Sequence, residues 1–166
     1  MDDAYFMEKA LEQARVALAA GEFPVGCVMV HGRDILATGA REGTTGNRPN
    51  EVDHAEIVAL RKLSRLDRKV NMQDVAVFST LEPCLMCFGA LVISDVGRIV
   101  FAYEDAMGGG TRCDCTHMPP LYRESPIKIE SGVLRKDSLE LLKSYFSQRQ
   151  NTYLMDSLLA TYTLDQ

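Results

Sequence analysis

Short apolar runs alternate with helical patterns along most of the chain, and this alternation limits the possible folds more than any other feature. Short runs that contain apolar residues predict strands over 25–30, 35–38, 75–79, 99–102 and 127–130, of which 75–79 reads as buried. Apolar residues at helical spacing, with suitable starts and stops, predict helices over 4–20, 53–63, 84–94 and 138–148. Strands that alternate with helices indicate a three-layer α/β domain with a mostly parallel or mixed sheet.

The segments between these elements predict how the chain is divided. Residues 32–34 are predicted to form a hairpin turn, and residues 43–52 and 107–120, which are rich in turn-forming residues, are predicted to be loops. The chain has 166 residues, which suits one domain with a full core. We predict a domain over residues 1–149 and a C-terminal tail, 150–166, that is helical over 152–161.

Composition limits the compartment and the partners. The sequence holds no apolar run of the roughly 18 residues that a membrane span needs, so no membrane partner is expected. It begins with Met1-Asp2-Asp3, acidic where a secretory signal is basic, and its five cysteines are an odd number. These features favour a cytoplasmic protein. A net charge of -5 argues against a general nucleic-acid binder, although it leaves room for a local basic patch.

Two short motifs, "HAE" at 54–56 and "PCLMC" at 83–87, together predict a zinc site. Cys84 and Cys87 lie three apart at a helix start, so both sulfurs share one face, and the helix dipole favours thiolates. His54 at the start of another helix can supply a third ligand. Three protein ligands leave one position for water, as in catalytic zinc sites. Single motifs have simpler explanations, because Cys-x-x-Cys can be a redox pair and His54 can be structural.

Glu56 lies two residues after His54 and is predicted to be the catalytic acid and base. It can accept a proton from the water at the metal and pass that proton to a substrate nitrogen. The expected reaction replaces an amino group on a ring carbon and releases ammonia. The pattern Asp53-x-x-Glu56 also fits a capping box, which by itself would explain Glu56. The order H-x-E followed by P-C-x-x-C is the described signature of zinc nucleobase deaminases.

The sequence resembles the cytidine and deoxycytidylate deaminase superfamily, and within it the bacterial tRNA adenosine deaminases. The likeness covers nearly the whole chain. It is carried by "FPVGCVMV" (23–30), "DHAEIVALR" (53–61), "STLEPCLMCFGALVISDVGRIVFAYEDAMGG" (79–109) and "IKIESGVLRKDSLELLKSYFSQR" (127–149).

The resemblance implies a cytidine deaminase-like α/β/α fold with a five-stranded mixed sheet and one Zn²⁺ per chain. It implies that His54, Cys84 and Cys87 bind the metal and that Glu56 transfers protons. The main-chain N–H of Ala55 would help to hold the substrate ring, and Glu82 and Pro83 are expected at the same site. Members of this branch are homodimers with substrate pockets near the subunit interface.

The sequence departs from the family first in the region before His54. Arg41 stands where the family has a pocket asparagine, and the loop that follows is about two residues longer. Because arginine donates hydrogen bonds but cannot accept them, base recognition at this position must differ. Arg41 could line the pocket, bind a phosphate or carboxylate, or face solvent.

Further departures concern "TRCDCTH" at 111–117 and the tail. Cys113, Cys115 and His117 could form a second metal site or belong to an ordinary surface loop.

In the tRNA editors the C-terminal helix is basic, whereas residues 150–166 contain two Asp and no Lys or Arg. A basic cluster near the second helix could hold RNA or be a solvated face. It consists of Arg61, Lys62, Arg65, Arg68 and Lys69. Cys27 is expected to be a small core residue.

Three functions are consistent with the sequence. The first is a zinc-dependent deaminase of adenosine at the wobble position of tRNA. The second is the same chemistry on a free base, nucleoside or other small amino-heterocycle, of the guanine or cytosine type. The third is a zinc-stabilised binding module without catalysis, for which Glu56 would be dispensable.

Overall fold

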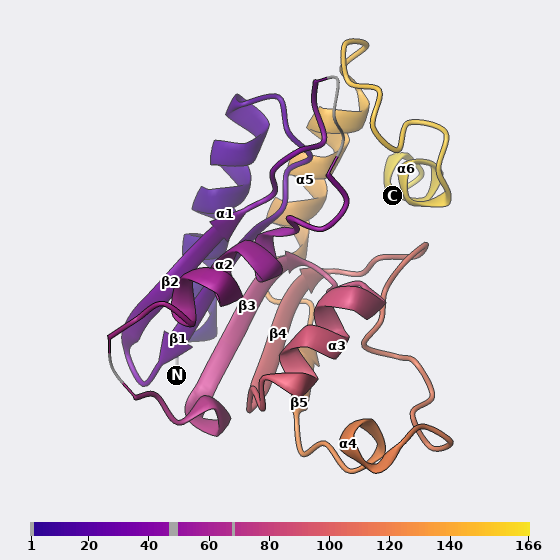
Figure 1. Cartoon of the computed structure of the whole chain (residues 1–166). Coiled ribbons are helices and arrows are strands. Elements are labelled where there is room, and N and C mark those ends of the chain that lie inside the picture. Colours follow the sequence, from indigo (N-terminus) through magenta and orange to yellow (C-terminus); the bar gives the residue numbers. More distant parts are fainter. Residues whose placement is uncertain (1, 47–49, 68) are drawn as a thin grey trace.

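The computed structural model describes residues 2–46, 50–67 and 69–166 and forms a single three-layer α/β/α unit (Figure 1). The strands are β1 Gly26–His31, β2 Asp34–Ala40, β3 Val75–Leu81, β4 Arg98–Tyr103 and β5 Lys128–Ser131. The helices are α1 Asp3–Ala19, α2 Ala55–Leu63, α3 Leu85–Ile93, α4 Pro120–Arg123, α5 Arg135–Phe146 and α6 Leu158–Leu164, with a 3₁₀ turn η1 at Met72–Asp74.

The sheet is five-stranded and mixed, in the order β2-β1-β3-β4-β5, which confirms the predicted fold class. β1 pairs antiparallel with β2 and β3, and Val28 lies opposite both Thr38 and Phe78. β3, β4 and β5 are parallel, with Val77 opposite Ile99 and Ile99 opposite Ile129. The predicted hairpin between β1 and β2 is therefore confirmed.

Both faces of the sheet are covered, so its central strands are apolar on both sides. Successive side chains of β1 alternate between two core clusters, with Cys27 and Met29 in one and Val28 and Val30 in the other. Helices α2 and α3 cover the first face, and α1 covers the second together with part of α5 (Figure 1). Cys27 is fully buried, as expected for a small core residue.

The ends of several helices differ from the predictions, and the tail differs most. The predicted tail helix over 152–161 is wrong at its start, because α6 begins at Leu158. Leu154 has a left-handed φ of 59°, which ends any helical run before it, and the Ser157 hydroxyl caps the new helix by accepting from the Ala160 N–H. Helix α5 begins three residues earlier than predicted, at Arg135 rather than Ser138.

The tail belongs to the same core as the rest of the chain. Leu159 and Ala160 are each 1% exposed and pack in the cluster under α2 and α3. Within the described ranges, no helix is both long and apolar enough to cross a membrane.

Candidate metal centre and active site

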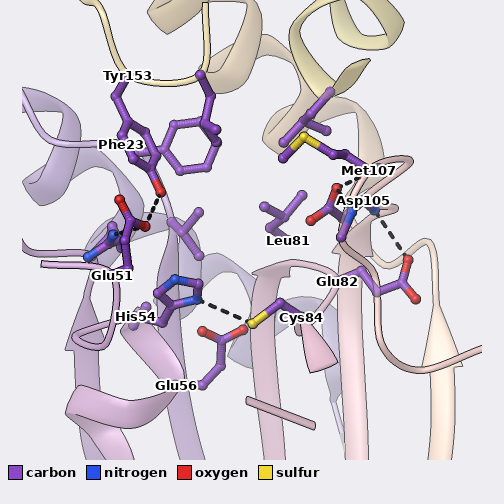
Figure 2. Close-up of a pocket in the computed structure, with 16 residues that line it drawn as sticks. Phe23, Glu51, His54, Glu56, Leu81, Glu82, Cys84, Asp105, Met107 and Tyr153 are labelled. Carbon is purple, nitrogen blue, oxygen red and sulfur yellow. Dashed lines mark hydrogen bonds and ion pairs between the residues drawn. The ribbon is translucent and has the colours of Figure 1, made fainter. Parts of the chain in front are cut away.

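The structure brings His54, Cys84 and Cys87 together at one point. Figure 2 shows two of these residues, His54 and Cys84, beside Glu56. Their candidate ligand atoms all lie within 4.8 Å of one another, and both sulfurs lie 3.5 Å from His54 Nδ1. One imidazole nitrogen and two thiol sulfurs are the donor set that Zn²⁺ prefers, and three ligands match a catalytic site. The predicted convergence of the two motifs is therefore present in the fold.

Two helix starts position these side chains. His54 is the N-cap residue of α2, and Cys84 is the N-cap residue of α3, with Cys87 on the first turn of α3. Gly39 of β2 permits the close approach of α2, because a Cβ at this position would overlap the Ala55 carbonyl. The chain leaves β3 at Leu81 and reaches Cys84 directly, so the site lies at the carboxyl ends of the parallel strands.

The two thiols differ in their ionisation. The pKa of Cys84 is lowered to about 4, first by a hydrogen bond from the Cys87 thiol and then by the His54 ring. The pKa of Cys87 is raised because the Cys84 thiolate holds its proton and because it is buried. The pKa of His54 is raised, first by its hydrogen bond to Cys84. The site thus carries a thiolate next to a proton that a bound cation would displace.

Glu56 is buried, with 3% of its surface exposed, beside the two cysteines. The Ser79 hydroxyl donates to its Oε1 at 3.1 Å, and the Cys87 thiol lies 3.6 Å from its Oε2. Burial raises the pKa of Glu56, which suits a group that both accepts and returns a proton. The capping-box explanation of Glu56 is wrong, because the N-cap residue of α2 is His54 rather than Asp53. The His54 side chain makes no cap hydrogen bond.

A cavity of about 260 Å³ opens above these residues (Figure 2). Its lining includes His54, Glu56 and Cys84, together with Ala55, Glu82 and Arg41 from the predicted substrate-binding set. Pro83 is buried but does not belong to the lining formed by the described residues; its carbonyl accepts the Gly110 N–H at 2.9 Å.

Arg41 is buried, so the expectation that it could face solvent is wrong. Its Nη1 donates to the carbonyls of Asn50 at 2.8 Å and Asp53 at 3.2 Å and also to that of Glu42, and its Nη2 lies 3.3 Å from Glu51 Oε2. The guanidinium therefore fastens the segment between β2 and α2 from inside. The carboxylate that pairs with the Arg41 guanidinium is thus that of Glu51 in the same chain.

Asp105, an acidic residue on the opposite wall of the cavity, was not among the predicted site residues. Its main-chain N–H donates at 3.2 Å to Oε2 of Glu82, which was among them and is 2% exposed. Asp105 Oδ1 accepts the N–H groups of Met107 and Gly108 at 2.9 Å, and burial raises the pKa of Asp105. The segment "YEDAMGG" gave no local signal for this position, because a carboxylate after a strand is common in loops.

The tail also contributes to the lining, through Tyr153, Leu154 and Leu159. No pattern in the sequence connects these residues with the motifs at 54–56 and 83–87. Their contribution results from the path of the chain after α5.

The candidate second metal site is not assembled. Cys113 and His117 are exposed, and the Cys115 thiol donates to the Cys113 carbonyl at 3.5 Å. Across the ranges that the structure describes, the group of His54, Cys84 and Cys87 is the one arrangement suited to hold an ion. In the basic cluster, Arg61 pairs with Asp53, Lys62 donates to the Thr38 carbonyl, and Arg68 lies outside the described residues.

The chain is similar to known proteins over most of its length. It is 30% identical over 150 residues to a tRNA-specific adenosine deaminase of Rickettsia bellii, covering 86% of this chain and 98% of the relative. A solved tRNA:A34 deaminase superposes with a TM-score of 0.62 at 27% identity, covering 83% of this chain and 99% of that protein. The guanine deaminase of Nitrosomonas europaea superposes with a TM-score of 0.68 at 27% identity, covering 86% of this chain and 83% of that protein.

A family match covers the part of the chain that holds both motifs. The family described as the cytidine and deoxycytidylate deaminase zinc-binding region matches residues 1–103. This span includes β1 to β4 and the two helices whose starts carry His54, Cys84 and Cys87. With more than half of the chain matched and the fold shared, this protein belongs to the cytidine and deoxycytidylate deaminase zinc-binding family.

Proposed function

We propose that the protein is a zinc-dependent hydrolytic deaminase that removes an exocyclic amino group from a nucleobase. The observation that carries this proposal is the convergence of His54, Cys84 and Cys87 beside the buried carboxyl of Glu56, on the floor of a cavity. This reaction needs a metal ligand set, a proton-transferring group and a space for an aromatic ring.

His54 Nδ1 and the sulfurs of Cys84 and Cys87 would hold one Zn²⁺. The three atoms lie close enough to share one ion, and two thiolates with a neutral imidazole balance its charge. When bound, zinc would supply a Lewis acid that makes water a competent nucleophile near neutral pH. The proton that remains on the Cys87 thiol would leave as the ion binds.

Glu56 would move the protons. Its Oε2 faces Cys87 and its Oε1 is fixed by the Ser79 hydroxyl, so the carboxyl has a defined orientation at the floor of the cavity. It would take one proton from the attacking water and deliver it to the ring nitrogen as the C–O bond forms, and would then carry the remaining hydroxyl proton to the amino nitrogen, which leaves as ammonia. The main-chain N–H of Ala55 would hold the ring, and Glu82 would fix the opposite wall through Asp105.

Adenosine at the wobble position of tRNA is the first candidate substrate. Support comes from the relative in Rickettsia bellii and from the solved tRNA:A34 deaminase, both of which align over most of this chain. A free base or nucleoside of the guanine or cytosine type is the second candidate. It is supported by the likeness to a solved guanine deaminase and by the tail residues that line the cavity.

The protein is proposed to act as a homodimer. Helix α3 presents Leu85 at 57% exposure and Ile93 at 60%, an apolar face next to the site. Burying such side chains against a second copy would be favourable.

Ammonia release by the zinc-loaded protein tests the proposed reaction. The panel contains an adenosine-bearing anticodon stem-loop, free bases, ribonucleosides and small amino-heterocycles, with metal-free protein as the blank. Release from at least one compound, with the amino group replaced by oxygen in the product, is expected. If no compound is turned over by protein that carries one zinc per chain, the noncatalytic binding module becomes the better explanation.

A further inference from the structure

The C-terminal tail crosses the top of the catalytic cavity (Figure 2). We call residues 151–159 the roof segment. Three of its side chains, those of Tyr153, Leu154 and Leu159, line the cavity that has His54 and Glu56 on its floor. Without the roof segment, the cavity would lose the wall opposite its catalytic floor.

The roof segment is anchored at both ends. At its start, the Asn151 side chain is buried and donates from Nδ2 to the Tyr145 carbonyl of α5 at 2.9 Å. At its end, Leu159 is 1% exposed in the main core. A segment with buried anchors on both sides is held in place by packing as well as by its contacts at the cavity.

Between these anchors, Tyr153 fastens the roof segment to the segment before α2. Its hydroxyl donates to Glu51 Oε2 at 2.7 Å, across 102 positions of sequence. The Arg41 guanidinium lies 5.7 Å from the centre of the Tyr153 ring, and the Phe23 ring lies 5.6 Å from it. The Tyr153 phenol, the Glu51 carboxylate and the Arg41 guanidinium form one connected group at the edge of the cavity. Figure 2 shows the Tyr153 and Glu51 members of this group.

The charge around the cavity disfavours phosphate. The described lining residues include the carboxyl groups of Glu51, Glu82 and Asp105 in addition to Glu56. Arg41 is the one arginine among these lining residues, and its side chain is 2% exposed and bound to main-chain carbonyls and Glu51. Phosphate binding rests on accessible cations, and this lining presents none to a phosphate that enters the cavity with the base.

The size of the cavity also favours a small ligand. Its volume of about 260 Å³ lies near the lower end of small-molecule sites, which start at roughly 300 Å³. A base that is carried on RNA must enter together with its sugar and with contacts to the flanking nucleotides, so it needs an open edge above the pocket. The roof segment occupies space above the catalytic floor.

We propose that the roof segment makes the cavity a chamber for a free aminated heterocycle of nucleobase size, and that Tyr153 is the specificity-determining residue that excludes a base carried on ribose or RNA. This inference rests on the proposed deaminase function and, of its two candidate substrates, selects the free base over the tRNA adenosine. Tyr153 acts by closing the chamber and takes no part in the chemistry at the metal.

The test compares the full-length, zinc-loaded protein with Tyr153→Ala. Ammonia release is measured from adenine, guanine and cytosine, from their ribonucleosides, and from the stem-loop. We expect the wild type to prefer its best free base over the matching ribonucleoside by about 100-fold in kcat/KM. Tyr153→Ala should raise KM for the base about tenfold, change kcat little, and reduce the preference about tenfold.

Tyr153→Phe and Tyr162→Phe form a matched pair. Each variant removes one hydrogen bond of 2.7 Å from a tail tyrosine to a carboxylate, to Glu51 in the first case and to Glu104 in the second. Tyr162 does not belong to the cavity lining among the described residues. Tyr153→Phe should therefore raise KM for the base, and Tyr162→Phe should leave KM and the base-to-nucleoside preference at the wild-type values.

A binding measurement separates failure of this inference from failure of the proposed function. Calorimetry with zinc-loaded Glu56→Gln should detect one free base per chain, weakened by adding Tyr153→Ala, and weaker binding of the stem-loop. Preferred turnover of the stem-loop by the wild type, or an unchanged preference in Tyr153→Ala, would overturn the inference and leave the deaminase function standing. Binding of a base that Tyr153→Ala weakens, without turnover by the wild type, would support the chamber and refute the deaminase function. Absence of both binding and turnover would refute both.

Discussion

At the scale of single residues, Arg41 shows how one buried cation can organise a loop. A guanidinium donates hydrogen bonds but cannot accept one from a base. It can satisfy several carbonyls at once, and here it binds those of Asn50 and Asp53 while it lies against the Tyr153 ring. The geometry of the loop before His54 thus depends on one buried cation.

Replacing this cation tests that dependence. Arg41→Met should lower the free energy of unfolding by about 2–4 kcal/mol, because buried carbonyls and the Glu51 carboxylate lose their donor. Denaturant unfolding of the zinc-loaded protein measures the change. Arg15→Met is the control, since Arg15 is exposed and pairs with Glu8 on the surface of α1, where a loss below about 1 kcal/mol is expected. Equal losses in the two variants would mean that Arg41 does not hold the loop.

The metal ligands give a second prediction at this scale. Cys84→Ala and His54→Ala should each lower the zinc content of the purified protein well below one ion per chain, because two remaining ligands hold zinc poorly. Cys27→Ala is the control, because Cys27 is a fully buried cysteine in the core cluster and outside the metal group. Elemental analysis measures the stoichiometry, and an unchanged zinc content in Cys84→Ala would show that the ligand assignment is wrong.

At the scale of elements, an ion pair connects β4 with α5 and α6. The Arg135 Nε donates to Glu104 Oε2 at 2.8 Å, and the Tyr162 hydroxyl donates to Glu104 Oε1 at 2.7 Å. The Arg135 guanidinium lowers the pKa of Glu104 to about 2 from an ordinary value of 4.5. The charged carboxylate is therefore stabilised in the folded state relative to the unfolded chain.

The stability of the protein should depend on pH through this group. The contribution of Glu104 is fully present above pH 4.5 and is lost as the pH falls toward about 2, where the folded-state carboxylate becomes protonated. Glu104→Gln should thus be less stable than the wild type at pH 7, and the difference should shrink between these two values. Glu140→Gln, an exposed change on α5, the helix that carries Arg135, is the charge-matched control. A difference that stays constant down to pH 2 would contradict the assignment to Glu104.

The elements differ in how far the sequence could predict them. Strands β1, β3 and β4 were predictable because they are apolar on both faces and flanked by turns. Helices α2 and α3 were predictable because their motifs and their apolar spacing are local features of the sequence. The tail helix was misplaced because the left-handed backbone at Leu154 leaves no signal in a leucine. The lining residues Asp105 and Tyr153 were missed for a related reason: each joins the site through contacts distant in sequence, as in the bond from Tyr153 to Glu51.

At the scale of the whole molecule, the apolar face of α3 predicts self-association. Ile93→Glu should convert a dimer into monomers, because a carboxylate at the centre of an apolar interface is costly to bury. Val16→Glu on α1 is the control, since Val16 is 59% exposed, comparable with Ile93 at 60%. Analytical ultracentrifugation measures the mass, and a wild type that stays monomeric at high concentration would contradict the proposed dimer.

Glu56 is proposed to transfer protons at a zinc site formed by His54, Cys84 and Cys87. This proposal is tested by the rate of ammonia release from the best substrate, compared between zinc-loaded wild type and zinc-loaded Glu56→Gln. The variant should keep one zinc per chain and the wild-type fold, while kcat falls by about 10²–10⁴-fold. A variant that retains its zinc and releases ammonia at the wild-type rate would contradict the proposal.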